Sequence, residues 1–464
     1  MEVSMLRSFP RPQAALRAPR RRSAFLFALM GCGPVWAQQP PPVPATAKAP
    51  TVPLTLAQAI RTALDQNPRI HQSLLALAES GEDRRAAASA LLPSVGAQAI
   101  GQRAKNNLDA FIGVPTPHGP QVVGPFNWGQ LALEARVSLF DLSLWQRWRA
   151  SQHAEDSVRA QGRAVREEIT ALVVGQYLRA LRTQESLKAA QSRVGLAEAL
   201  ALLATSQQKQ GVGTRLDTLR AQVQVQTERQ RLLQAQTQRT TALAGLARLL
   251  TLEPGTQVDL LDTLEAPTLP VITFQEAYAS GLRQRPDLAA LEAREKAAGS
   301  LREAAQGLRL PSLFASGNYG STGLQSQPWA TTYQLSLGIR VPLFTGGLVS
   351  AQVAKAKSEQ ARVQEARRDV QSQVSLEVTV AQAELASARS EVEVATLALS
   401  LSDEVLIQAR HRFEAGVSNN IEVINAQDEL ARAHDNRISA LYRLNQARAD
   451  LARAMGQLES LFTR

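Results

Sequence analysis

Histidine, cysteine and the nucleophilic side chains are the groups with which this sequence could bind a metal or catalyse a reaction. The 464-residue chain contains one cysteine and five histidines, which are His71, His118, His153, His411 and His434. The histidines lack the spacing of metal ligands, and His411, just before a turn, is interpreted as a solvated helix residue. No phosphate-binding glycine loop, nucleophile motif or CxxC pair occurs. The sequence therefore predicts no catalytic residue, no metal site and no cofactor.

Two glycine-containing stretches are better candidates for a functional site, and their chemistry is that of binding. QGVGTRLDTLRAQ at 210–222 and AGVSNNIEVINAQ at 415–427 each predict a turn that opens an amphipathic helix. One interpretation is that their glycines only end a helix, where a left-handed residue is favoured. The other is that a partner packs on small exposed residues. These candidate residues are Gly211, Val212, Gly213, Gly416, Val417 and Ser418.

The two stretches belong to a long repeat, with predicted copies over 54–254 and 272–464. LTLAQAIRTALDQNPRI at the start of the first copy matches ITFQEAYASGLRQRPDL at an offset of 218 residues. VSLF at 137–140 matches VPLF at 341–344 at an offset of 204 residues, so the first copy carries about 14 extra residues before this anchor, and the glycine stretches match at 205. A period this long indicates a duplicated domain, with 255–271 as the linker between the copies.

Each copy is predicted to begin with a helix and to continue with two strands. Thr55 and Thr273 can cap the helices, which must stop before Pro93 and Pro311. Period-two alternation then predicts strands that are apolar on one face and polar on the other. The clear strands lie over 130–140 and 332–344 and the weaker ones over 95–104 and 313–322, with loops over 105–129 and 321–331.

After the strands, the sequence changes to long helices. From Leu348 to Ala415 the chain has neither proline nor glycine. A continuous helix of about 67 residues would be about 100 Å long, whereas helices in globular domains average about 11 residues. A coiled-coil hairpin accommodates this length. The chain would turn at Gly211 or Gly416 and return through 214–250 or 418–460, with Thr214 and Asn419 as the N-caps.

Four strands per chain are too few to cross a membrane alone. Open strand edges cannot face lipid, because each unpaired backbone group costs several kcal/mol there. Membrane barrels begin at about eight strands, so several chains must contribute. Three chains would give a 12-stranded barrel with room for a wet lumen.

Residues 1–37 are predicted to be a secretory signal peptide. A basic region ending at Arg22 precedes the apolar stretch AFLFALMGCG, which is shorter than the about 20 residues of a transmembrane helix. Cleavage after Ala37 fits the small-residue pattern, and the alternative is a lipoprotein signal with Cys32 acylated. The Pro-rich segment 38–53 is predicted to be an extended tail.

The positive charge does not indicate a nucleic-acid partner. The formal net charge is +10, but residues 1–37 hold six arginines and one acid. Without them the charge falls to about +5, from 45 bases and 40 acids, and it is spread evenly. No nucleic-acid partner is expected.

The whole chain after the signal peptide resembles the outer-membrane efflux protein family, the TolC-like outer-membrane factors. The resemblance rests on the duplicated strand–strand–helical-hairpin plan, the paired Leu-Pro-Ser motifs, RPDL at 285–288, V-x-L-F at the strand ends and the Gly-Val turns. It implies a mixed α/β membrane protein. Three chains with four strands each would form a 12-stranded β-barrel, continued by a long α-helical coiled-coil barrel.

The resemblance also implies a location, partners and further site residues. The barrel would lie in the outer membrane and the helices in the periplasm, where the tips of the homotrimer meet an adaptor (membrane fusion protein) that joins an inner-membrane pump. Asp217 and Glu422 would narrow the tunnel, although acids also favour the first turn of any helix. A tyrosine and an arginine that tie the second tip shut in the family are Phe413 and Ser418 here, so that latch is not expected.

The predicted function is a passive exit duct for tripartite efflux or type I secretion. A periplasmic coiled-coil spacer without a channel is the alternative, and a hydrolase on a helical scaffold is a third. The ten-residue strands with one apolar face favour the duct, since a spacer has no need of them.

Overall fold

The computed structural model describes residues 51–107, 122–267, 272–324 and 328–462. The predicted signal peptide, most of the predicted N-terminal tail and residues 463–464 lie outside these ranges. The expected cleavage after Ala37 and the alternative acylation of Cys32 are therefore not tested by the described residues.

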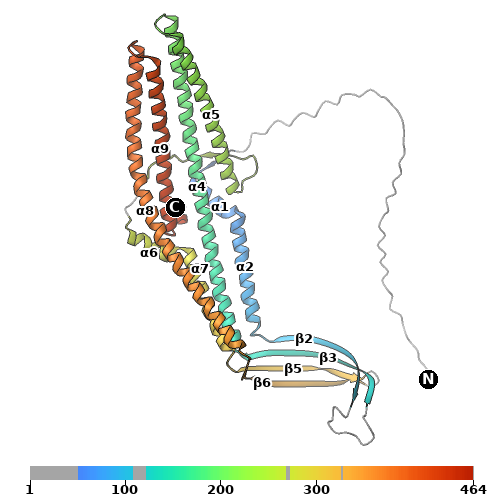
Figure 1. Ribbon diagram of the computed structural model, residues 1–464. Helices are drawn as coiled ribbons and strands as arrows, with labels where there is room; N and C mark the ends of the chain where they lie inside the picture. The colour runs from blue at the N-terminus through green and yellow to red at the C-terminus, as the bar shows by residue number, and fades with distance from the viewer. Residues whose placement is uncertain (1–50, 108–121, 268–271, 325–327, 463–464) are drawn as a thin grey trace, which may run out of the picture. The chain divides into compact units, whose positions relative to one another are not determined.

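Four long helices form two antiparallel hairpins. α4 (Leu142–Lys209) returns as α5 (Arg215–Leu249), and α8 (Leu348–Glu414) returns as α9 (Asn420–Ala454). Because α4 packs on α9, the helices follow one another in the order α5–α4–α9–α8 (Figure 1). The predicted long helix from Leu348 is confirmed at 67 residues, since no proline or glycine interrupts it.

Alanine at intervals of seven residues explains how these helices pack. A seven-residue repeat keeps one seam of a helix facing its partner, and alanine lets the backbones approach closely. The buried alanines of α9 follow this interval without a gap, as Ala426, Ala433, Ala440, Ala447 and Ala454. Rows with the same interval are buried on the other three helices: Ala190, Ala197 and Ala204 on α4; Ala221, Ala235 and Ala242 on α5; Ala381, Ala388 and Ala395 on α8.

Each copy of the repeat opens with two helices, so the prediction of a single helix is wrong. α1 (Leu56–Gln66) and α2 (Pro68–Ser89) correspond to α6 (Phe274–Gln284) and α7 (Pro286–Gly307). Thr55 and Thr273 form the expected caps, each within a reciprocal capping box. The breaks fall at Asn67 and Arg285, because a residue before proline is driven out of the helical region.

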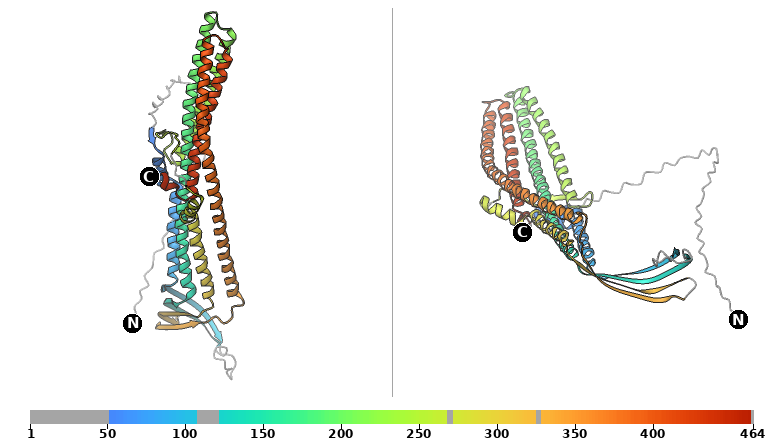
Figure 2. Two further views of the ribbon diagram at one scale, coloured as in Figure 1. Left: turned by 90° about the vertical axis from the view of Figure 1, so that its left-hand side faces the viewer. Right: turned by 60° about the horizontal axis from the view of Figure 1, so that its bottom comes forward.

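The four predicted strands form one antiparallel sheet, in the order β2–β3–β5–β6. β2 spans Ser94–Asn107, β3 Val122–Phe140, β5 Ser312–Leu324 and β6 Ala330–Arg340. The loops predicted over 105–129 and 321–331 are therefore too long, because their ends belong to strands: 105–107 to β2, 122–129 to β3, 321–324 to β5 and 330–331 to β6. A bulge opposite Lys105 accommodates Gly124 and Pro125 in that strand. The views in Figures 1 and 2 place the sheet at the ends of the long helices opposite the tips.

A short parallel pair corrects two predicted boundaries. β1 (Thr51–Leu54) includes the last residues of the predicted tail, and β4 (Gln257–Leu260) lies within the predicted linker. Buried Tyr177 of α4 holds this pair, because its hydroxyl lies 3.0 Å from the carbonyl oxygen of Leu54 and 2.7 Å from Oδ2 of Asp262. Burial, and then the hydrogen bond to Asp262, raise the pKa of Tyr177. α10 (Leu458–Phe462) inserts Leu458 into the same core.

Within the part of the chain that the structure describes, no helix combines the length and the hydropathy that a membrane crossing requires.

Candidate functional site

The first helical tip is a tight turn around Gly211. This residue has φ +79°, a left-handed conformation that glycine adopts without strain. The amides of Val212 and Gly213 donate hydrogen bonds of 3.1 and 3.0 Å to the carbonyl oxygen of Gln207, which completes the C-cap of α4. Thr214 then caps α5 by accepting a 3.2 Å hydrogen bond from the amide of Asp217, as the sequence predicted.

The second tip repeats this geometry around Gly416. Its φ is +71°, and its amide donates a 3.1 Å hydrogen bond to the carbonyl oxygen of Phe413. The amide of Val417 donates to Arg412 at 3.0 Å. The predicted N-cap is confirmed, because Asn419 accepts from the amide of Glu422 at 3.4 Å. The capping role expected for both tip glycines is therefore present in the structure.

The tips also expose the small apolar surface that a docking site requires. Val212 is 77% exposed and Val417 is 72% exposed. A Cβ atom added to Gly211 or Gly416 would meet nothing within 4 Å, so both backbones are open to a partner. Gly213 differs, because its Cβ would lie 2.9 Å from that of Gln207. Ser418, its counterpart, keeps a buried hydroxyl without a hydrogen-bond partner among the described residues.

The two tips are joined to each other. The side chain of Asn420 on α9 donates a 2.9 Å hydrogen bond to the carbonyl oxygen of Asp217 on α5. Gln207 of the first tip reaches the carbonyl oxygen of Phe413 in the second, at 3.4 Å. A hydrophobic cluster beneath them includes Ala204, Phe413 and Val423. Sequence reasoning missed Asn420. The available signal was a second asparagine directly after the N-cap Asn419, at a position inside the helix where asparagine is not favoured.

Asp217 and Glu422, the predicted constriction, make local contacts. The Asp217 carboxylate accepts from the Thr214 hydroxyl, within the cap of its own helix. Glu422 lies 3.2 Å from Nε of Arg412 in an exposed ion pair across the second tip. Both contacts fit the first-turn interpretation, and the constriction stays a prediction. Phe413 is buried in the hydrophobic cluster beneath the tips. Its side chain has no polar group with which to form the family's latch.

Below the tips, an acid replaces alanine in a packing row. Glu228 occupies the alanine interval of α5 and its side chain is 3% exposed. Arg193 of α4 lies 3.3 Å from it and Arg231 lies 2.5 Å from it. Arg193 also approaches Asp435 of α9 at 3.3 Å. The network joins three helices, and its sequence signal, an acid in an alanine row, was overlooked.

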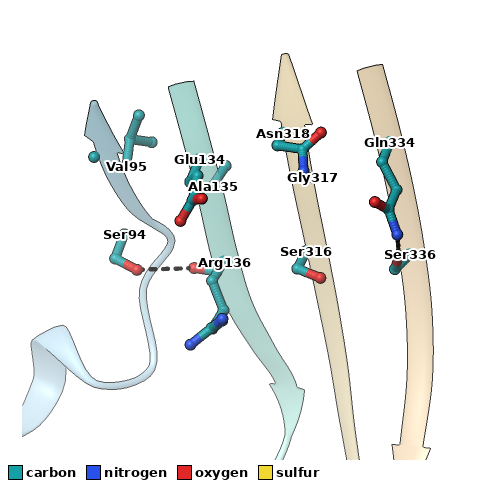
Figure 3. Close-up of a pocket in the computed structure, with 11 residues that line it drawn as sticks. Ser94, Val95, Glu134, Ala135, Arg136, Ser316, Gly317, Asn318, Gln334 and Ser336 are labelled. Atoms are coloured by element: carbon teal, nitrogen blue, oxygen red, sulfur yellow. Dashed lines mark hydrogen bonds between the residues drawn. The ribbon is translucent and has the colours of Figure 1, made fainter. Parts of the chain in front are cut away.

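The sheet has one polar face and one apolar face. Glu134, Asn318 and Gln334 lie side by side on the polar face, across β3, β5 and β6, above a hollow of about 420 Å³ (Figure 3). Arg136 follows Glu134 on the same face of β3 (Figure 3). On the opposite face Leu335 and Leu337 are 81% and 70% exposed. A strand that is wet on one side and apolar on the other suits a wall between water and lipid.

The ends of the sheet are open among the described residues. β2 pairs only with β3, and β6 pairs only with β5. Each outer edge therefore presents a row of unpaired backbone groups, which a membrane does not tolerate.

Comparison with known proteins identifies this combination of sheet and helical hairpins. The family model described as "Outer membrane efflux protein" matches residues 59–251 and 277–457. The chain belongs to the outer membrane efflux protein family. It is therefore an efflux protein of the outer membrane and not an enzyme.

Individual relatives agree with this assignment. Protein CyaE of Bordetella pertussis is 29% identical over 318 residues, which cover 67% of this chain and 66% of CyaE, just under two thirds of its length. Outer membrane protein OprJ of Pseudomonas aeruginosa is 25% identical over 425 residues, 86% of this chain and 84% of OprJ. The open-state MtrE outer membrane channel of Neisseria gonorrhoeae has a TM-score of 0.72 at 21% identity, covering 87% of this chain and 89% of that chain. At this identity the likeness to MtrE shows the fold alone.

Proposed function

We propose that three copies of this efflux-family chain form a passive exit duct. The sheets would close into a 12-stranded barrel in the outer membrane, and the helical hairpins would continue its wall into the periplasm. The observation that carries the proposal is the sheet itself, which has an apolar face, a polar face and two open edges. Closure pairs the edges and keeps the polar face, with Glu134 and Arg136, towards water.

The strand directions are compatible with closure between copies. Neighbouring strands of β2–β3–β5–β6 are antiparallel, so β6 of one copy runs opposite to β2 of the next. Two copies would supply eight strands, the smallest usual barrel, and three supply twelve, which leave a wider lumen for export.

The two outer helices of the row α5–α4–α9–α8 support the same assembly. α5 exposes Leu216, Leu219 and Val223 at helical spacing. α8 exposes Val394, Leu397 and Leu401 at helical spacing. Apolar rows on both outer helices suit a ring of copies in which α5 of one copy covers α8 of its neighbour.

The mass of the purified particle tests the proposal. The full chain, extracted in detergent and placed in lipid nanodiscs, should give particles of three protomers by mass photometry. Particles of one protomer in both environments would overturn the duct. Particles of two would overturn the 12-stranded barrel.

The tips are proposed as the docking surface for a periplasmic adaptor, which would join the duct to an inner-membrane pump. Gly211, Val212, Gly213, Gly416, Val417 and Ser418 form this surface, and the open backbones with the exposed valines support it. Asp217 and Glu422 follow one turn further along and are proposed to narrow the periplasmic end. The spacer alternative is disfavoured, because it leaves the apolar face of the sheet without a role.

A further inference from the structure

The apolar face of β2 ends in two basic residues. Alternate residues of a strand share a face, and from the helical end these are Val95, Ala97, Ala99 and Gly101. The next two on that face are Arg103 and Lys105, and both are exposed. They lie at the end of the strand that is distant from the helices, because β2 follows α2 at its other end.

Three glycines at one level of the sheet, and one tryptophan, mark where the apolar face of the sheet ends. Gly101, Gly129 and Gly323 are neighbours in the register of three strands. Cβ atoms at Gly129 and Gly323 would lie 2.7 and 3.0 Å from the ring of Trp329, so the indole lies over these two glycines. Tryptophan is enriched where lipid tails give way to headgroups. Arg103 follows Gly101 by one step away from the helices.

The distance along the strand agrees with that level. The apolar face begins at exposed Ile339, four residues nearer the helices than Leu335, which shares the register level of Val95. Gly101 is therefore ten residues beyond the level of Ile339, which is about 33 Å of strand at about 3.3 Å per residue. With the usual tilt of about 40°, this corresponds to about 25 Å across the membrane, the height of the apolar band of such barrels. Arg103 and Lys105, two and four residues beyond Gly101, therefore fall at the headgroups.

Neither basic side chain is neutralised by the described part of the protein. Arg103 and Lys105 make no side-chain hydrogen bond or ion pair with any residue in the described ranges. Glu134 is the one acid in the described residues of the four strands, and it lies on the polar face. The two positive charges thus stand together, on the lipid side, without a partner of opposite sign in those ranges.

We propose that Arg103 and Lys105 bind the phosphate groups of a phosphorylated glycolipid in the outer leaflet, of the lipid A type. The site rests on the proposed duct, since it requires that the apolar face contacts lipid. Arg presents a planar fork of donors that fits two phosphate oxygens, and Lys adds a point charge to the same or the second phosphate. In a closed barrel there would be three such sites, one on each copy.

Binding of defined lipids to the intact particle tests this site. Delipidated full-length protein in detergent is titrated with diphosphoryl lipid A and followed by native mass spectrometry. Arg103→Gln combined with Lys105→Gln should weaken binding about tenfold or more, because charge-assisted hydrogen bonds to phosphate are among the stronger ones. Arg136→Gln is the matched control, since it removes one positive charge from the opposite face of the same sheet and should bind like the wild type.

Binding of related lipids tests which headgroup the site recognises. Monophosphoryl lipid A should bind several-fold more weakly than the diphosphoryl form, and millimolar inorganic phosphate should not displace either. The proposal is overturned if the double variant binds diphosphoryl lipid A as the wild type does, or if phosphatidylglycerol binds as tightly as lipid A. In either case particles of three protomers would leave the duct standing, whereas particles of one protomer would remove both proposals.

Discussion

Asn420 of α9 donates its side-chain hydrogen bond to the backbone carbonyl of Asp217 in α5, 203 residues away, at 2.9 Å. The Asn420 side chain is fully buried, whereas Asp217 is only partly buried. The hydrogen bond lies in the first turn of both return helices and fixes one tip against the other. Together with the Gln207 bond and the shared hydrophobic cluster, it holds the two tips against each other.

Replacing Asn420 with alanine is expected to loosen the tips. The substitution removes the hydrogen bond that joins the two hairpins, and a typical bond of this kind contributes about 0.5–1.5 kcal/mol. Amide hydrogens of residues 207–220 and 412–425 should exchange faster in the variant, while those of the sheet keep their protection. Asn425→Ala, an exposed asparagine on the same helix, is the control and should change neither. Unchanged exchange at both tips would show that the bond does not hold them.

The tip turns were predictable because their causes are local. A glycine with positive φ after a helix and a Thr or Asn before the next helix act within a few residues, and both were found where the sequence placed them. The breaks at Pro68 and Pro286 were equally local and were missed only because the helical periodicity was extended across them.

Contacts between distant segments were not predictable in the same way. The bond from Asn420 to Asp217 depends on how two hairpins pack, and the pairing of β1 with β4 joins residues about 200 positions apart. Nothing in either segment alone specifies its partner. The early start of β3 was hidden by Gly124 and Pro125, which typically indicate a loop and here lie in a bulge.

Glu228→Ala should destabilise the hairpins even though alanine fits the row it joins. The change leaves Arg193, itself mostly buried, without its buried acid and with only the half-exposed Asp435 beside it, and breaking a buried ion pair costs about 3–5 kcal/mol. Thermal unfolding followed by helical circular dichroism should shift to a lower temperature. Adding Arg193→Ala should recover part of that loss, because it removes the positive charge that has lost its buried partner.

The control for Glu228 is an exposed ion pair on the same two helices. Glu198 contacts Arg229, and both side chains are about half exposed. Glu198→Ala should cost less than about 1 kcal/mol, as surface pairs do. Equal shifts for the two alanine variants would contradict a special role for the buried acid.

Leu335→Arg should impair insertion far more than Gln334→Arg. The two residues are neighbours on β6 and point to opposite faces, so the comparison changes only the side of the wall that receives the charge. An arginine facing lipid near the midplane costs about 2–4 kcal/mol per copy, whereas the polar face stays wet. The folded fraction after refolding into lipid vesicles measures the difference. If both variants insert equally, the apolar face does not contact lipid.

Gly416→Glu is expected to separate assembly from export. Glutamate at φ +71° costs about 1 kcal/mol of capping energy, too little to dissociate long coiled coils, but its side chain occupies the open space around the tip. The variant should reach the outer membrane in wild-type amounts and yet fail to support export by the linked pump. Gly416→Asn is the matched control, because asparagine tolerates the left-handed conformation and is smaller and uncharged. It should keep most of the export. Wild-type export by the glutamate variant at wild-type abundance would mean that the tip glycine only ends a helix, and that the adaptor binds elsewhere.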